Sequence, residues 1–79
     1  MNIEIVTPDE NIYSGEIKLV KLPGTDGSFE VLKNHAALIS TLEKGEIKLI
    51  DINNDVKFFD VNEGVVEVLN NKITVLLSS

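Results

Sequence analysis

His35 is the only histidine in this sequence, and its side chain is the one best suited to acid–base chemistry near neutral pH. The chain has no cysteine and no second histidine, so a zinc site of the usual kind lacks its ligands. A serine nucleophile would need His35 as its base, and no serine stands in a nucleophile-elbow context. These residue types therefore do not predict covalent or metal-assisted catalysis.

The sequence also gives little support for a phosphate-binding loop or for a catalytic group of carboxylates. The turn-rich stretch Pro23–Gly27 lacks the lysine and the following helix of a phosphate-binding P-loop. The carboxylates are dispersed through predicted turns and strands, which is typical of a solvated surface. We predict no catalytic, cofactor-binding or metal-binding residues, and no cofactor.

The elements that must position these residues are strands. Apolar residues alternate with polar ones almost throughout, as in Ile3 and Ile5, Ile47 and Leu49, and Ile73 and Val75. Turn markers separate the runs; they are Pro8-Asp9, Ser14-Gly15, Lys44-Gly45, Asn53-Asn54-Asp55, Asn62-Glu63-Gly64 and Asn70-Asn71. No helical stripe exceeds a turn or two, so the pattern predicts one all-β domain over residues 1–79, a small flattened sandwich or barrel of about ten short strands.

Three of these runs change phase halfway along. Ile17 and Leu19 give way to Val20 and Leu22, and the runs beginning at Ile47 and at Val56 shift in the same manner. A β-bulge or a corner at which a strand changes sheets would explain this pattern. The other explanation is an outer face that is apolar because another subunit covers it.

The stretch Pro23–Leu38, which reads PGTDGSFEVLKNHAAL, interrupts this alternation. Pro23-Gly24 and Asp26-Gly27 are turn dipeptides, because glycine tolerates the positive φ that such turns require. We expect an exposed loop here, which is where a binding surface is commonly found.

Charge and hydropathy limit the partners. The net charge of −6 disfavours direct binding to nucleic acid or to anionic lipid headgroups and favours a basic protein surface. No apolar run approaches the roughly 18 residues of a membrane span, so direct lipid insertion is not expected.

An ordered series of residues resembles the epsilon subunit family of rotary F-type ATP synthases, whose mitochondrial counterpart is called delta. That family typically reads Pro-Gly-x-x-Gly-Glu-x-Gly and then Val-Leu-Pro-Gly-His-Ala-Pro-Leu. The residues that match with the same spacing are Pro23, Gly24, Gly27, Val31, Leu32, His35, Ala36 and Leu38. Further similarity runs from Ile5-Val6-Thr7-Pro8 to Ile73-Thr74-Val75-Leu76, which covers nearly the whole chain.

The departures from this pattern are local. Ser28 and Glu30 stand where the family has glutamate and glycine, and because residues two apart share a face of a strand, the carboxylate is displaced along the chain. Lys33-Asn34 replaces Pro-Gly, and asparagine tolerates the left-handed conformation of that glycine. Ala37 replaces a proline.

The resemblance implies a non-catalytic rotor subunit in the central stalk of a proton-translocating ATP synthase. Such a subunit lies peripherally on the cytoplasmic face of the bacterial inner membrane and couples rotation of the c-ring through gamma to ATP synthesis or hydrolysis. On this basis we expect two partners, the gamma subunit and the c-ring. The expected c-ring contacts are Thr25, Asp26, Gly27, Ser28, Phe29 and Glu30, with Phe29 as an apolar anchor. The expected gamma contacts are His35, Ala36, Ala37 and Leu38. An equally good interpretation of His35 is a structural residue that holds its loop. The corresponding alternative for the two alanines is that they fill the core.

Members of this family commonly continue into a two-helix C-terminal domain that restrains hydrolysis and in some species binds ATP. The sequence ends at Leu77-Ser78-Ser79, just after the last predicted strand. We therefore expect a naturally short form, with no C-terminal helical hairpin and no nucleotide binding, that couples rotation but does not inhibit hydrolysis.

Two other classes of protein remain as alternatives. A lipoyl or biotinyl carrier domain is also an acidic β-sandwich of about this length, and Lys44 or Lys72 near a turn would carry the cofactor. Its modified lysine is normally flanked by methionine or alanine, whereas the only methionine here is Met1. The other alternative is a β-sandwich interaction module with an unspecified partner.

Overall fold

The computed structural model describes residues 1–78, and these residues form eight strands. The strands are β1 (Asn2–Val6), β2 (Asn11–Gly24), β3 (Gly27–Leu32), β4 (Leu38–Leu42), β5 (Gly45–Asp51), β6 (Val56–Val61), β7 (Gly64–Leu69) and β8 (Lys72–Leu77). The described residues contain no helix, and therefore none that could span a membrane. The prediction of an all-β domain is confirmed.

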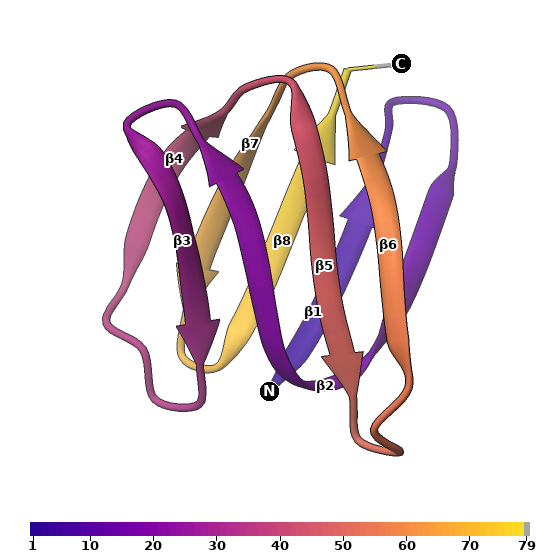
Figure 1. Ribbon diagram of the computed structural model, residues 1–79, viewed down its shortest axis with the longest axis vertical. Coiled ribbons are helices and arrows are strands. Elements are labelled where there is room, and N and C mark those ends of the chain that lie inside the picture. The colour runs from indigo at the N-terminus through magenta and orange to yellow at the C-terminus, as the bar shows by residue number, and fades with distance from the viewer. Residues whose placement is uncertain (79) are drawn as a thin grey trace.

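The strands form two layers that share strand β2 (Figure 1). One layer consists of β3, the second half of β2, β5 and β6, and the other of β4, β7, β8, β1 and the first half of β2. β1 and β8 pair in parallel, and every other pair is antiparallel. The first half of β2 pairs with β1, and Gly24 at the end of β2 pairs with Leu42 of β4. β2 therefore connects both edge strands of the second layer, and these strands form a closed ring.

The phase change in β2 marks the corner at which this strand passes from one layer to the other. Asn2 pairs with Glu16 in one layer and Ile17 pairs with Asp51 in the other, so the transfer occurs between adjacent residues. The register shifts between Ile17 and Leu19, which leaves Lys18 as the extra residue of a bulge. The bulge and the corner that the sequence suggests are therefore confirmed for β2.

The phase changes in β5 and β6 have another cause. Pairing between these strands runs without a shift from Gly45 with Val61 to Ile50 with Val56. Val61 is buried, whereas Val56 and Phe58 are exposed on the opposite face. In these strands the apolar residues occupy both faces of the sheet.

Strand number is lower than the sequence suggests because two predicted turns lie inside β2. Ser14-Gly15 pairs with Glu4 and Ile3, and Pro23-Gly24 pairs with Ser28 and Gly27. A Cβ atom at Gly24 would come within 2.7 Å of the Gly27 carbonyl oxygen. Glycine is therefore needed at position 24 because two backbone segments approach closely there, and not because the residue has a positive φ. β2 is consequently one strand of 14 residues.

The core lies between the layers and is built from the inward-facing residue of each alternating pair. Its fully buried aliphatic side chains come from both layers and include Ile3, Leu22, Leu49 and Ile73. Tyr13 of β2 and Phe59 of β6 pack with their ring centroids 5.4 Å apart, which joins the two layers at one side of the sandwich. The domain is a flattened block of 27 × 23 × 18 Å.

Candidate partner-binding surfaces

The expected c-ring contacts occupy the β2–β3 turn and the first part of β3, and the expected gamma contacts occupy the loop after β3 and the first residue of β4. The turn Thr25-Asp26 precedes β3, and the segment 33–37 follows it, so the strand separates them (Figure 1). The predicted single loop from Pro23 to Leu38 is therefore a hairpin followed by a loop. Its two halves face opposite ends of the sandwich.

The β2–β3 turn is fastened to the other layer. The Thr25 amide donates to the Thr41 carbonyl at 3.1 Å, and the two threonine hydroxyls lie 2.7 Å apart. Gly27 has a φ of 127°, a conformation that other residues rarely adopt. Asp26 is exposed next to Thr25, so its carboxylate is accessible while these hydrogen bonds hold the backbone of the turn in place.

β3 presents its carboxylate outwards and its aromatic ring inwards. Ser28 and Glu30 are both exposed, which confirms that the two positions share a face. Phe29 is half-buried and packs against the core, and its ring would touch a Cβ atom at Gly24. The pleat of β3 directs this ring towards the sandwich, and the role of Phe29 as an apolar anchor stays a prediction.

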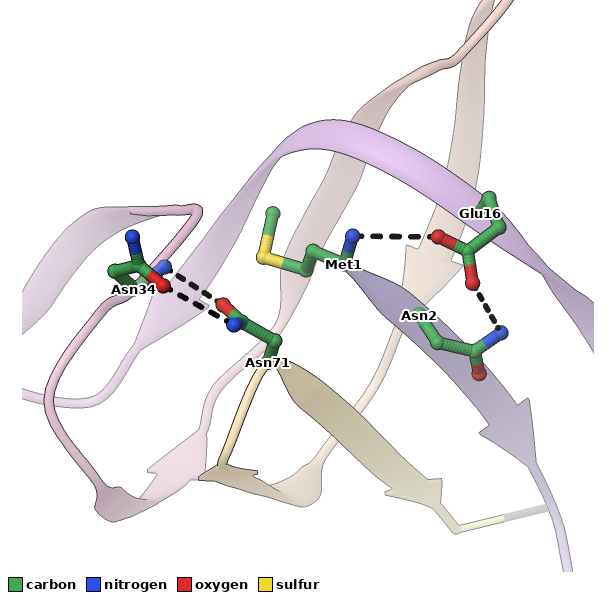
Figure 2. A network of polar contacts seen from close by, with 5 residues as sticks. All are labelled: Met1, Asn2, Glu16, Asn34 and Asn71. Carbon is green, nitrogen blue, oxygen red and sulfur yellow. Dashed lines mark hydrogen bonds and ion pairs between the residues drawn. The ribbon is translucent and has the colours of Figure 1, made fainter.

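The loop that follows β3 is held by a polar clamp between two asparagines (Figure 2). The Asn34 amide donates to Asn71 Oδ1 at 2.7 Å, and Asn71 Nδ2 donates to Asn34 Oδ1 at 3.1 Å. Both residues have positive φ, 66° and 61°, so the expected left-handed conformation of Asn34 is confirmed. The clamp ties this loop to the β7–β8 turn.

The same corner contains the N-terminus. The Asn71 carbonyl accepts a hydrogen bond from the Asn2 amide at 2.9 Å, and the Met1 amino group lies 3.3 Å from a Glu16 carboxylate oxygen (Figure 2). Asn2 Nδ2 donates to the other Glu16 oxygen at 3.1 Å. These hydrogen bonds, first that from Asn2 and then that from the terminal amine, lower the pKa of Glu16. No local sequence pattern indicates this network, because Asn2, Glu16, Asn34 and Asn71 are far apart along the chain.

His35 is half-buried within the clamped loop. Its amide donates to the Leu32 carbonyl at 3.1 Å, and its Nδ1 lies 2.8 Å from the Ala36 carbonyl oxygen. A carbonyl oxygen only accepts, so Nδ1 carries the proton in this contact. The geometry therefore supports the structural interpretation of His35, in which one ring nitrogen holds the loop.

Ala37 and Leu38 lie at one end of a shallow groove, and Ala36 precedes them. Ala36 and Ala37 are exposed, so they do not fill the core. Leu38 is half-buried against the core, and the groove of about 370 Å³ beside it is also lined by Ala37 and Ile39. The side chain of Ile39 is 75% exposed, which leaves an apolar edge next to the loop.

A second groove, of about 460 Å³, lies at the other end of the sandwich. Thr25 and Thr41 form one part of its wall, and Val65 and Leu76 form another. Within residues 1–78, no three His, Cys, Asp or Glu side chains gather closely enough to hold a metal ion.

The two lysines considered for a carrier domain differ in position. Lys44 lies in the β4–β5 turn, whereas Lys72 is the first residue of β8 and pairs with both Asn2 and Leu69. Lys72 is therefore inside a three-stranded array and not at the tip of a hairpin.

Comparisons with known proteins agree with the fold and with the resemblance. The family model described as "ATP synthase, Delta/Epsilon chain, beta-sandwich domain" matches residues 1–79. A curated ATP synthase epsilon chain from Campylobacter jejuni strain 81-176 is 46% identical over 78 residues, which cover 96% of this chain and 59% of the relative. The epsilon chain of Sulfurimonas denitrificans is 43% identical over 77 residues, with 98% and 59% covered. The chain thus spans about three-fifths of the length of these relatives.

Solved structures share the architecture at low sequence identity. A chain of the Euglena gracilis mitochondrial ATP synthase superposes with a TM-score of 0.88 at 16% identity, covering 95% of this chain and 48% of that one. A chain in the central stalk and c-ring structure of the Tetrahymena thermophila enzyme gives 0.83 at 16% identity, with 100% and 63% covered. Together with the family match, these similarities do not favour a carrier domain or an unrelated interaction module. The chain belongs to the β-sandwich domain family of the ATP synthase delta/epsilon chain.

Proposed function

We propose that this domain is a non-catalytic rotor element of a proton-translocating ATP synthase. In this role it binds gamma and the c-ring and helps to couple their rotation to ATP synthesis or hydrolysis. The enzyme holds it peripherally at the cytoplasmic face of the bacterial inner membrane. The epsilon chains that resemble it over 96% or more of its length support this assignment.

The observation that carries the proposal is that two anchored surface segments lie towards opposite ends of the sandwich. Thr25–Glu30 at one end is the proposed c-ring contact, with Asp26 and Glu30 facing basic groups of the ring loops. His35–Leu38 at the other end is the proposed gamma contact, where the exposed Ala36 and Ala37 permit close approach of a partner backbone. Each segment is tied to the second layer, one through Thr41 and the other through Asn71.

The attachment of both contact segments to the second layer is suited to the transmission of torque. A sandwich that closes through β2 has few free edges and few soft modes, so a force applied at one end reaches the other with little deformation. The acidic chain, with a net charge of −6, is also matched to basic partner surfaces.

Site-directed cross-linking in the assembled enzyme tests the assignment. The chain has no cysteine, so Asp26→Cys and Ala36→Cys each introduce a unique thiol for a photoreactive cross-linker. We expect Asp26→Cys to couple to a c subunit and Ala36→Cys to couple to gamma. Asn53→Cys, in the exposed β5–β6 turn two strands away from β3, is the matched control and should give neither product efficiently. Exchange of the two products, or cross-linking no stronger than the control, would contradict the proposal.

A further inference from the structure

Strand β6 has a free edge. It pairs with β5 on one side, and within residues 1–78 no strand pairs with its other side (Figure 1). The backbone N–H and C=O groups along such an edge can pair with a strand of another molecule. Four of the six residues of β6 are Val or Phe, which favour strand pairing. This edge is therefore prone to associate unless another feature opposes it.

Lys57 stands at an inward-facing position of this strand. Residues two apart share a face of a strand, and Phe59 and Val61, which follow Lys57 at that spacing, pack in the core. Leu49, which pairs with Lys57 from β5, is fully buried. Lys57 itself is half-buried. The strand thus carries a charge where its alternation calls for an apolar side chain.

The ammonium group of Lys57 depends on water. Lys57 makes neither an ion pair nor a side-chain hydrogen bond within residues 1–78. A charge without a partner is costly to bury, but a lysine can lay its methylene groups on apolar surface while its ammonium group stays hydrated. Because β5 covers one side of β6, the route to water leads past the free edge. Lys57 therefore requires this edge to stay uncovered.

We propose that Lys57 prevents the free edge of β6 from pairing with a second copy of this chain. Two copies related by a two-fold axis would join their β6 edges and extend the layer of β3, β2, β5 and β6 across both molecules. Both Lys57 side chains would then lie between the joined inner faces, cut off from water. Asp60 faces outwards, so no register that joins the inner faces brings a carboxylate of β6 to Lys57. An inward charge on an edge strand opposes such pairing.

The other outermost strand of this layer, β3, has no such residue. Its inward positions hold Phe29 and Val31, which are apolar. The segments at its two ends are instead hydrogen-bonded to the second layer, through Thr41 and Asn71. Lys57 thus acts at the edge that lacks these attachments of β3. This role concerns the free chain and is independent of the proposed rotor function.

Sedimentation velocity of the chain over a range of concentrations tests the inference. Lys57→Val replaces the inward charge by a β-branched apolar residue, so we expect the dissociation constant for self-association to fall by about tenfold or more. Lys57→Arg keeps the charge and should sediment like the parent chain. Lys72→Val removes the same charge from β8, which is paired on both sides, and should also sediment like the parent chain.

Amide hydrogen exchange followed by NMR locates the contact. In Lys57→Val, the β6 amides that point away from β5 should exchange more slowly as the concentration rises. The β6 amides bonded to β5 should keep their rates. If Lys57→Val precipitates, Lys57→Thr is the second variant, because threonine is also β-branched and uncharged but less apolar.

Four results would overturn the inference. A Lys57→Val chain that sediments like the parent would show that the lysine does not keep the edge free. Equal association of Lys72→Val would assign the effect to the loss of charge in general. Association without slower exchange in β6 would place the contact on another surface. Concentration-dependent protection of β6 in the parent chain would show that Lys57 does not prevent pairing.

Discussion

Asn34 and Asn71, 37 positions apart in the chain, both adopt a left-handed backbone and exchange two hydrogen bonds. The clamp connects the loop after β3 with the turn between β7 and β8, which belong to different layers. It therefore positions the segment that we assign to gamma.

Asn71→Gly tests the energetic weight of this clamp. Glycine keeps the positive φ but removes both side-chain hydrogen bonds, so we expect a loss of about 1 kcal/mol in the free energy of unfolding. Asn70→Gly is the control, because Asn70 has a φ of 51° and its side chain makes no hydrogen bond within residues 1–78. Urea denaturation compares the two variants. Equal stabilities would mean that the clamp contributes nothing.

Gly24→Ala and Gly15→Ala distinguish two kinds of close packing within β2. The new Cβ atom at position 24 would meet the Gly27 backbone oxygen at 2.7 Å, which cannot move without distorting the hairpin. At position 15 the obstacle is the Tyr13 hydroxyl at 2.9 Å, the end of a side chain that can swing away. We expect a loss of about 1–3 kcal/mol for Gly24→Ala and a much smaller change for Gly15→Ala, measured by urea denaturation. A reversed order would show that the hairpin yields more easily than the tyrosine.

Glu16 provides a pH-dependent contribution to stability whose sign follows from its lowered pKa. A carboxyl group with a lower pKa in the folded chain stabilises that state above its ordinary pKa of 4.5. The contribution is lost as the pH falls through the folded-state pKa. Glu16→Gln should therefore be less stable than the parent near neutral pH, with the difference shrinking under acid conditions.

Asn2→Ala tests the largest cause of the lowered pKa of Glu16. It removes the hydrogen bond to Glu16, so the pKa of Glu16 should rise towards its ordinary value. An NMR titration of the Glu16 carboxyl carbon reads this directly. An unchanged midpoint would assign the shift to the terminal amine alone.

Ala36→Trp tests the proposed approach of gamma to the loop. Ala36 is exposed, so the larger side chain should change the free energy of unfolding by no more than about 0.5 kcal/mol. If a partner backbone packs against this position, the affinity for gamma should fall by about tenfold or more. Asn62→Trp, an exposed position in the β6–β7 turn at the other end of the sandwich, is the control and should leave the affinity unchanged. Equal affinities of the two variants for gamma would contradict the contact.

Much of the fold and part of the candidate surface follow from the sequence alone. The alternation of Ile3 and Ile5, or of Ile47 and Leu49, is a local property with a period of two, and it determines which side chains face the core. The replacement of glycine by Asn34 likewise predicts a left-handed residue, because few other side chains tolerate that conformation. The spacing from Pro23 to Leu38 identified the family.

Tertiary structure alone decided where the strands begin and end and which residues meet. Gly15 and Gly24 look like turn residues, but both lie inside β2, and at Gly24 the Gly27 backbone oxygen approaches so closely that only glycine fits. Alternation also does not reveal register. The opposition of Ile17 and Asp51 and the clamp between Asn34 and Asn71 depend on pairing between segments 34 and 37 residues apart. Hydrogen bonding and core packing across the two layers select that pairing, and no local pattern encodes it.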